Sequence, residues 1–397
     1  MLNHLLGSSR LPLNHRLAAR GLPGRFAYSG PMPSPLKSSG HRVLINALGD
    51  NPLDAVEHHL TVEPMPAPDV TCLAPLDVLV AVKSAAVGWV DLLMSSGQYQ
   101  HVPKPPYTPG LEYAGEVAGV GADVKHVNEG DAVLVDGFVA GPRSVGEYQA
   151  SGGFATWAVV PAEAVKRIPE GLSFDQAASL LGSYETAIHC LVTRGKLKAG
   201  ETVLVLGASG ATGVAAVQVA KLLGATVIAA GRNDEKLAVV KSLGADQVIN
   251  TGGGTFRDAV KALTGGTGVD VVYDGVGGEL SLEALRCVKF GARFLIVGWA
   301  STPFVAKGKG QRGAPNANQL PTNLIMMKGL DVLGCPTVIS ALNDPSLRGP
   351  RHELLWRWVE SGQLKPHVSH VFPLNEVKEA MRAKWRGDIV GGCVLRP

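Results

Sequence analysis

The sequence has few cysteines, and none of them lies close to another along the chain. No Cys-x-x-Cys pair occurs. Because structural zinc sites and small disulfide-rich folds both need clustered cysteines, neither class of protein is indicated. Reduced thiols are the simpler interpretation. The five positions are Cys72, Cys190, Cys287, Cys335 and Cys393.

Long apolar runs and a strong excess of one charge are also missing. The apolar stretches are short and broken by glycine, so they do not predict a transmembrane helix. The 37 basic and 34 acidic residues leave a net charge of +3, which indicates no polyanionic partner. A length of 397 residues, of which 46% are hydrophobic, favours a folded protein of two domains.

No acidic residue occurs between Met1 and Gly49. The same stretch is rich in arginine and serine and begins with several leucines, which is typical of an organelle transit peptide. We therefore expect residues 1–40 to be a disordered transit peptide that is removed on import, with the mitochondrion favoured over the plastid. If the stretch is only a basic tail, the protein is expected to be cytoplasmic.

The stretch Thr202–Lys221 combines a strand, a glycine turn and a helix. Thr202–Leu206 is an apolar, β-branched run that predicts a buried strand, and apolar residues then recur at helical spacing. Between them lie Gly207, Gly210 and Gly213, each three residues apart, which in this context predict dinucleotide binding. The first glycine allows a tight turn, the second admits a pyrophosphate, and the third lets the helix pack on the strand. The N-terminus of the helix then offers N–H groups to the phosphates.

Short strands without intervening helices fill the first part of the folded chain, which favours a small β-barrel. The expected strands are Val43–Ile45, Asp77–Ala86, Tyr113–Val120, Ala132–Val135 and Gly152–Val160. The run Pro64–Pro68 is expected to be a rigid connector, and Val87–Tyr99 a turn followed by a short helix. A helix capped by Ser173 and a second helix over Gly182–Val192 follow the barrel.

Strands and helices alternate from Thr202 on, which predicts a doubly wound parallel sheet. The expected strands are Thr202–Leu206, Thr226–Ala230, Gln247–Ile249, Val269–Asp274, Arg293–Val297 and Asp331–Gly334, with a helix at Asp234–Leu243 among those between them. The polar, glycine-rich stretch Ser301–Asn318 is expected to be a mobile loop. The tail is expected to form a helix at His352–Ser361, a strand at His367–Phe372, a helix at Asn375–Arg386 and a last strand at Gly392–Leu395.

Together with Asp91–Tyr99, Pro109–Val117, Leu243–Asp246 and Asp388–Gly391, the glycine motif resembles the medium-chain dehydrogenase/reductase superfamily. The closer similarity is to its zinc-independent NADPH:quinone oxidoreductase (zeta-crystallin-like) branch, and it covers most of the chain after about His41. It implies an α/β fold, in which a GroES-like β-barrel catalytic domain is interrupted by a Rossmann doubly wound parallel-sheet domain. The expected limits are 41–170 plus 341–397 for the catalytic domain and 171–340 for the NADP-binding domain.

The ligands of zinc-dependent members are missing. Such members carry a Gly-His-Glu triplet, whereas this chain has Gly110-Leu111-Glu112, and leucine has no lone pair to donate to zinc. The turn Val87–Trp89 likewise lacks the cysteine ligand. His101, His126 and His189 are interpreted as ordinary polar or packed residues. We therefore expect no metal in the site.

The second strand of the parallel sheet carries the signal for cofactor choice. NAD-selective sites have an acidic residue there, but Ile228–Gly231 ends without one, and Arg232 and Lys236 follow. A guanidinium can bind a 2′-phosphate bidentately, so NADPH is the expected cofactor. Asp234 and Glu235 suit a helix start, where acids are favoured. The expected cofactor contacts are Gly207, Ser209, Gly210, Ala211, Thr212, Gly213, Val214, Arg232, Lys236, Asp274, Gly275, Val276 and Gly298.

The resemblance also implies a reaction. Without zinc, a simple alcohol has no Lewis acid to stabilise its alkoxide. A quinone or an α,β-unsaturated carbonyl accepts hydride more easily, because the charge delocalises onto an enolate or phenolate. We expect an NADPH-dependent reductase of such substrates, in which Tyr99, at a position where related reductases have an active-site tyrosine, donates to the developing oxyanion. A packed surface residue is the other interpretation of Tyr99.

Two alternatives remain open from the sequence. An enoyl-thioester (enoyl-CoA or enoyl-ACP) reductase, or an alkenal/enone reductase, would use the same glycine motif and would suit an organelle. A non-catalytic NADPH-binding protein, like the crystallins of this branch, would need the motif too. In each case we expect a homodimer with no specific nucleic-acid partner and no membrane span, and for the enzyme a small-molecule quinone or enone as substrate.

Overall fold

A computed structural model of the 397-residue chain describes residues 39–144, 146–253, 255–301 and 318–397. The expected transit peptide, residues 1–40, lies outside these residues except for its last two. The expected loop Ser301–Asn318 lies outside them except for its two ends. Within the described ranges, no helix is long and apolar enough to cross a membrane.

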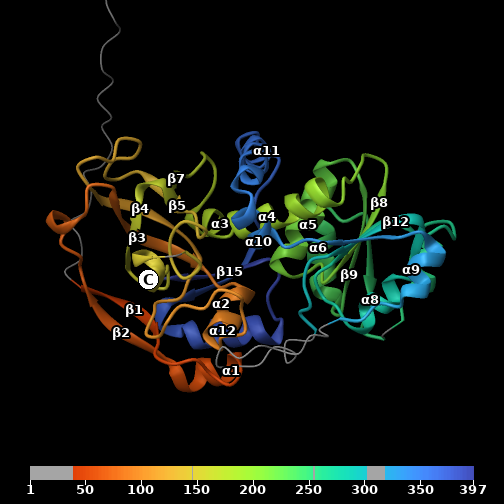
Figure 1. Ribbon diagram of the computed structural model, residues 1–397, viewed down its shortest axis with the longest axis horizontal. Coiled ribbons are helices and arrows are strands. Elements are labelled where there is room, and N and C mark those ends of the chain that lie inside the picture. Colours follow the sequence, from red (N-terminus) through yellow and green to blue (C-terminus); the bar gives the residue numbers. More distant parts are fainter. Residues whose placement is uncertain (1–38, 145, 254, 302–317) are drawn as a thin grey trace, which may run out of the picture. The chain divides into compact units, whose positions relative to one another are not determined.

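The six-stranded sheet in the second half of the chain is parallel throughout, with the strand order β10-β9-β8-β11-β12-β13 (Figure 1). Its strands are β8 (Thr202–Leu206), β9 (Thr226–Gly231), β10 (Gln247–Asn250), β11 (Val269–Asp274), β12 (Val288–Ile296) and β13 (Asp331–Gly334). Successive side chains of a strand point to opposite faces. Val203 and Val205 accordingly pack in one apolar cluster, and Leu204 and Leu206 pack in another. A continuous apolar run is therefore buried on both faces, as in parallel sheets generally.

Helices connect these strands and pack on both faces of the sheet. They are α5 (Ala211–Leu222), α6 (Asp234–Ser242), α7 (Arg257–Leu263), α8 (Glu279–Ala284) and α9 (Thr322–Lys328), and α10 (Thr337–Asn343) follows the last strand. The strand order changes direction between β8 and β11, and such a switch point is where doubly wound sheets bind ligands. Leu206, Asp274 and Ile296 lie in register at the carboxyl ends of three neighbouring strands. The glycine turn after β8 therefore opens at the switch point.

A second sheet of seven strands joins the beginning and the end of the chain (Figure 1). Its strands are β3 (Asp77–Ala86), β4 (Glu112–Val120), β5 (Ala132–Val135), β6 (Trp157–Pro161), β7 (Val165–Arg167), β14 (Val368–Pro373) and β15 (Gly392–Arg396). β15 pairs with β3 through Val394 opposite Ala86 and Leu395 opposite Ala85. The tail of the chain thus completes the sheet begun by the N-terminal strands, as the resemblance implies.

The expectation of a rigid connector at Pro64–Pro68 is wrong in its first half. β1 (Ser39–Ile45) and β2 (Leu60–Pro66) form a separate two-stranded antiparallel sheet, and Pro64 and Pro66 lie within β2. Proline lacks an N–H group, but an edge strand needs only part of its N–H groups for pairing. In a two-stranded sheet both strands are edges, so the prolines are accommodated.

The remaining helices lie around the seven-stranded sheet and beside α5. They are α1 (Pro52–Asp54), α2 (Trp89–Ser95), α3 (Phe174–Ala178), α4 (Leu181–Ile188), α11 (Arg348–Glu360) and α12 (Val377–Arg386). Ser173 caps α3 as expected, since its Oγ accepts a hydrogen bond from the Gln176 N–H at 3.3 Å. The helix expected over Gly182–Val192 is divided: α4 ends at Ile188, and His189–Arg194 continues as a π-helix. Widened turns of this kind occur often near functional sites.

Candidate active site

The glycine turn after β8 has the geometry that the sequence predicts. Gly207 has a φ of +67°, which favours glycine. A Cβ atom on Gly213 would lie 2.3 Å from the carbonyl oxygen of Gly207 and 2.8 Å from the Cα of Ala208. Any side chain at Gly213 would therefore push α5 away from the end of β8. Gly207 and Gly213 are required by backbone packing, independently of any ligand.

The N-terminus of α5 fits a phosphate group. Gly210 is its N-cap residue, and no side chain caps the helix. The first N–H groups of a helix have no partner inside it, and the helix dipole favours an anion there. Gly210 is exposed, and a Cβ on it would come no closer than 3.4 Å to the Gly207 oxygen. Ser209, Ala211 and Thr212 are only partly buried. The residues present thus fit the pyrophosphate of a dinucleotide.

A pocket lies directly beside this helix end. It is lined by Ala211 and Val214 of α5, by Tyr184 of α4, and by Glu112 and Gly391. The N–H of Gly391 also donates to the carbonyl oxygen of Ser209 at 2.9 Å. The tail of the chain is therefore fastened to the glycine turn, and both the seven-stranded sheet and α5 contribute residues to one pocket.

Asp91, at the start of α2, holds the backbone turn in front of the pocket. The residue is 2% exposed, and its carboxylate accepts hydrogen bonds from the N–H groups of Gly88 at 2.8 Å and Gly110 at 3.1 Å. Burial raises the Asp91 pKa to about 6, although these backbone bonds and the charge of Arg143 oppose the rise. Asp91 therefore fixes the position of Gly110-Leu111-Glu112 rather than facing the pocket itself.

Glu112 is a partly buried carboxyl group that lines the pocket. Burial raises its pKa to about 7, while a hydrogen bond from the N–H of Gly182 and the charge of Arg143 work in the opposite direction. The nearby carboxylates of Asp91 and Asp136 add to the rise. Near neutral pH, Glu112 is thus divided between its acid and its carboxylate. A group with such a pKa can give or take a proton at the pocket wall.

Tyr99 follows α2 and is partly buried beside His101, with 6.3 Å between the ring centroids. Burial raises the Tyr99 pKa, and the guanidinium of Arg143 lowers it. Because the net change is a rise, the phenol stays protonated at neutral pH and can only donate through its hydroxyl. The structure places Tyr99 near the charge that also acts on Glu112. Its contact with a substrate stays a prediction.

At the end of β9, the two expected cations have different surroundings. Arg232 is exposed, and within the described ranges it forms no ion pair. Lys236 Nζ donates a hydrogen bond to the carbonyl oxygen of Gly387, just after α12. The backbone N–H of Lys236 donates to Oδ1 of the N-cap residue Asn233 at 2.9 Å. Asp234 accepts a hydrogen bond from Asn250 Nδ2 at 2.8 Å, so its carboxylate is occupied. Arg232 is therefore the cation that is available for a 2′-phosphate.

The structure brings together the remaining expected cofactor residues, but it uses one of them internally. A Cβ on Gly207 would lie 2.8 Å from a methyl group of Val276, and one on Gly298 would lie 3.3 Å from the Gly275 oxygen. The buried Asp274 carboxylate accepts hydrogen bonds from the N–H groups of Val276 and Gly277, both at 2.9 Å, and from the hydroxyl of Ser281. Asp274 thus stabilises the loop after β11, and three hydrogen bonds from this loop and α8 already engage its buried carboxylate.

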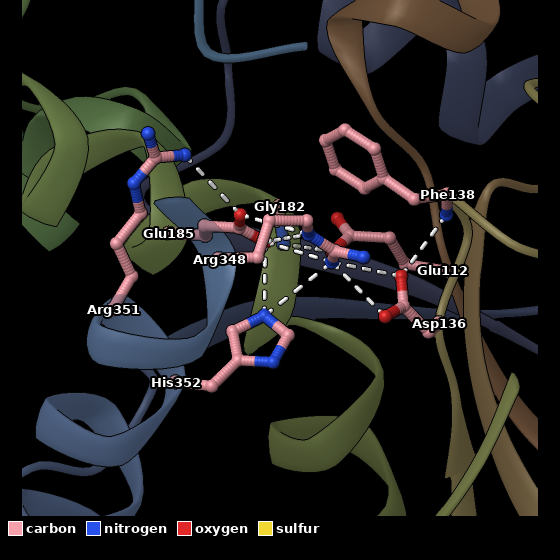
Figure 2. Close-up of polar contacts among 8 residues, drawn as sticks. All are labelled: Glu112, Asp136, Phe138, Gly182, Glu185, Arg348, Arg351 and His352. Carbon is pink, nitrogen blue, oxygen red and sulfur yellow. Dashed lines mark hydrogen bonds and ion pairs between the residues drawn. The ribbon is translucent and has the colours of Figure 1, made fainter. Parts of the chain in front are cut away.

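A buried ionic network lies beside Gly182 and joins the end of β5 to α4 and α11 (Figure 2). Arg348 donates to Asp136 at 3.0 Å and to Glu185 at 2.9 Å. Glu185, with a side chain only 1% exposed, also contacts His352 at 3.1 Å and Arg351 at 3.5 Å. Burial alone would raise the Glu185 pKa, but the hydrogen bonds from His352 and Arg348 and the charge of Arg348 lower it to about 2. The network fixes α4, which carries Tyr184 to the pocket.

Two protein-family descriptions match this chain. "Alcohol dehydrogenase GroES-like domain" matches residues 74–170, and "Zinc-binding dehydrogenase" matches residues 211–340. The quinone oxidoreductase-like protein 2 homolog of Nematostella vectensis is 34% identical over 325 residues, which cover 81% of this chain and 82% of the relative. The chain belongs to the quinone oxidoreductase family of the medium-chain dehydrogenase/reductase superfamily.

A second relative supports this assignment, and a solved structure has the same fold. The quinone oxidoreductase of Homo sapiens is 30% identical over 314 residues, which cover 79% of this chain and 87% of the relative. The crystal structure of Escherichia coli quinone oxidoreductase complexed with NADPH has the same fold, with a TM-score of 0.70 and 24% identity over 90% of this chain and 100% of that chain. The resemblance and the fold class expected from the sequence are confirmed.

One of the matching descriptions names zinc, so the residues at the family's zinc positions matter here. Leu111 is 3% exposed and packs as an apolar residue. His126 lies 3.3 Å from the carbonyl oxygen of Val165, and His189 is buried, with a pKa that burial lowers to about 4. In the part of the chain that the structure describes, no three His, Cys, Asp or Glu side chains are grouped to hold a metal ion. The expected absence of zinc stays a prediction for elemental analysis.

The sequence alone does not single out Glu112 or Glu185. The only signal for Glu112 is a carboxylate between the apolar residues Leu111 and Tyr113 at the start of a strand. Glu185 similarly stands in an apolar helix. Its partner Arg348 is 163 positions away along the chain, so no local pattern could connect the two.

Proposed function

We propose that the chain is a zinc-independent oxidoreductase that transfers hydride from NADPH to a quinone or an α,β-unsaturated carbonyl. The observation that carries this proposal is the uncapped N-terminus of α5, which opens into a pocket lined by Glu112 and Tyr184. Leucine at position 111 replaces the zinc ligand of metal-dependent relatives. The named relatives are a quinone oxidoreductase-like protein and a quinone oxidoreductase, and a quinone oxidoreductase of the same fold was solved with NADPH.

Each part of the site has a role in this proposal. The backbone at Gly210 and Ala211 would hold the pyrophosphate, and Arg232 the 2′-phosphate. Bound NADPH supplies the hydride. Val214 and Tyr184 limit the access of water to the pocket, because apolar and aromatic groups replace solvent there. Tyr99 would donate a hydrogen bond to the substrate oxygen. Glu112, with its pKa of about 7, would give or take a proton at the pocket wall.

Several finer properties are proposals as well. We propose a catalytic domain of residues 41–170 plus 341–397, a cofactor domain of residues 171–340, and a homodimer. For residues 1–40, the absence of acidic residues up to Gly49 supports a transit peptide, with the mitochondrion as the favoured destination.

A comparison of substrates tests the proposed function. The purified protein is expected to oxidise NADPH with a neutral naphthoquinone or an enone faster than with an enoyl-CoA, and faster than it oxidises NADH. Zinc should be absent by elemental analysis, and a chelator should leave the rates unchanged. Faster turnover of enoyl-CoA would identify an enoyl-thioester reductase. No turnover of any substrate, with NADPH still bound, would identify a non-catalytic binding protein.

Tyr99→Phe is expected to lower kcat by roughly two- to tenfold, the effect of one neutral hydrogen bond, and to leave the Kd of NADPH unchanged. The phenol would act as charge develops on the substrate, so its loss affects the transition state rather than the cofactor. Steady-state kinetics with a quinone, together with NADPH titration by fluorescence, measure both quantities. An unchanged kcat for every substrate would reduce Tyr99 to a packing residue.

A further inference from the structure

Arg143 lies on a tight turn that packs against the backbone of the pocket. Ser144 closes the turn, since its N–H donates to the carbonyl oxygen of Gly141 at 2.9 Å and its hydroxyl donates to the same oxygen at 2.7 Å. Earlier in this loop, a Cβ on Gly137 would lie 2.0 Å from the carbonyl oxygen of Leu111. The segment that carries Arg143 is therefore fixed directly against the turn that precedes Glu112.

The guanidinium of Arg143 has no acidic partner within the described residues. Its Cζ lies 4.9 Å from the ring centroid of Phe138, and its Nε is buried without a hydrogen-bond partner. Arg348 contacts the same ring, with its Cζ at 4.1 Å, but Arg348 is fully paired with Asp136 and Glu185 (Figure 2). One ring thus contacts one paired and one unpaired cation. A partly buried charge without a partner is costly, so this arrangement suits a site that binds an anion.

The charge of Arg143 acts on three ionisable groups, Tyr99, Glu112 and Asp91, of which Glu112 lines the pocket. Burial raises the pKa of Tyr99 and of Glu112, and the positive charge of Arg143 partly opposes this rise in both groups. It also opposes the rise in the pKa of Asp91. Lys384 of α12 faces Asp91 and Glu112 as well, so these carboxyl groups do not depend on Arg143 alone for a counter-charge. Within the described residues the guanidinium of Arg143 has no carboxylate partner and is available for an anionic ligand.

We propose that Arg143 is a catalytic residue that binds the substrate oxygen on which negative charge develops during hydride transfer. This inference rests on the proposed function. NADPH would give up a hydride from the C4–H bond of its dihydronicotinamide and become NADP⁺. The hydride would form a C–H bond with the substrate, and the π electrons of the substrate would move onto its carbonyl oxygen. A proton from solvent would then complete the saturated carbonyl product; for a quinone, the proton of the new C–H bond would also move to the oxygen to give the hydroquinone. Arg143 keeps its own proton throughout and supplies the positive charge that zinc supplies in metal-dependent relatives.

The test compares Arg143→Gln and Arg143→Lys with Arg167→Gln, a matched change at an exposed arginine on β7. With a neutral naphthoquinone, Arg143→Gln is expected to lower kcat by about a hundredfold, the typical loss of an oxyanion donor, with KM changed by less than about threefold. Arg143→Lys should recover part of the lost kcat, because lysine restores the positive charge but lacks the planar, multiply donating guanidinium group. Arg167→Gln should match the wild type. A thermal unfolding scan of each variant separates loss of catalysis from loss of fold.

A binding measurement needs no turnover. 2-Hydroxy-1,4-naphthoquinone carries a delocalised oxyanion at neutral pH and imitates the charged substrate oxygen. In the presence of NADP⁺, Arg143→Gln should weaken its binding at least tenfold and leave that of neutral naphthoquinone nearly unchanged. Equal binding of the anion by the folded variant and the wild type would overturn the proposal, and so would an unchanged kcat. A loss confined to KM, and only for a quinone with a sulfonate substituent, would show that Arg143 binds a fixed anion instead. If the wild type binds the anion through Arg143 but reduces no quinone or enone, the proposed function fails and the anion site remains.

Discussion

Arg348→Met is expected to lower the free energy of unfolding by about 3–5 kcal/mol at neutral pH, the range for removing one partner of a buried ion pair. Methionine keeps most of the volume of arginine but leaves the carboxylates of Asp136 and Glu185 without their shared cation. Their side chains are 4% and 1% exposed, so water cannot take its place. Chemical unfolding monitored by circular dichroism measures the difference.

Arg167→Met is the matched control for this prediction. Arg167 pairs with Asp131 at 2.8 Å, but the two side chains are 56% and 26% exposed. Exposed pairs contribute about 0–1 kcal/mol, because water and salt screen them. A comparable loss of stability in both variants would mean that burial of the network is not what makes Arg348 important.

The pH dependence of Arg348→Met follows from the Glu185 pKa. In the wild type this pKa is lowered to about 2 from an ordinary value of 4.5, so the stabilisation is complete above about pH 4.5 and is lost as the pH falls through 2. In the variant, burial would instead keep the Glu185 pKa high, and a neutral carboxylic acid would be buried at mildly acidic pH. The stability gap between the two proteins should therefore narrow on acidification. A gap that is independent of pH would contradict the role of Glu185.

The parallel sheet could be predicted closely from the sequence because its information is local. The buried, β-branched runs give β8 and β11 with the expected limits, Thr202–Leu206 and Val269–Asp274. Alternation likewise gives the expected limits of β3, Asp77–Ala86. Local patterns predict the ends of a strand less well where pairing with another strand determines them. β12 begins at Val288 rather than Arg293, because residues near Val288 pair with the start of β11.

The chemistry of the pocket was only partly predictable, for a different physical reason. The backbone requirements of Gly207 and Gly213 are local, so the glycine turn could be identified. The electrostatics depend on groups from distant parts of the chain, such as Arg143 beside Glu112. Asp274 is a second example of this limit. Its position at the end of β11 suggests a cofactor contact, but in the structure its carboxylate accepts hydrogen bonds from N–H groups of the following loop.

Arg232→Ala is expected to weaken NADPH binding by roughly ten- to a hundredfold and to leave NADH binding nearly unaffected. A charge-assisted hydrogen bond contributes about 1.5–3 kcal/mol, and about 1.4 kcal/mol corresponds to a factor of ten in Kd. Only NADPH has the 2′-phosphate that the guanidinium would contact. The acid expected in NAD-selective sites is missing at the end of β9, and Asp234 is turned toward Asn250. Calorimetric titration of both cofactors gives the two dissociation constants.

Lys236→Ala provides the control, because the two cations differ in what they already bind. Lys236 donates to the Gly387 oxygen and so connects α6 to the end of α12. Its loss should reduce stability slightly and change the binding of the two cofactors by the same small factor. Arg232 has no such bond within the described chain, so its loss should discriminate between NADPH and NADH. An equal loss of both cofactors in Arg232→Ala would assign Arg232 to the fold, and a preference of the wild type for NADH would reject a 2′-phosphate site at the end of β9.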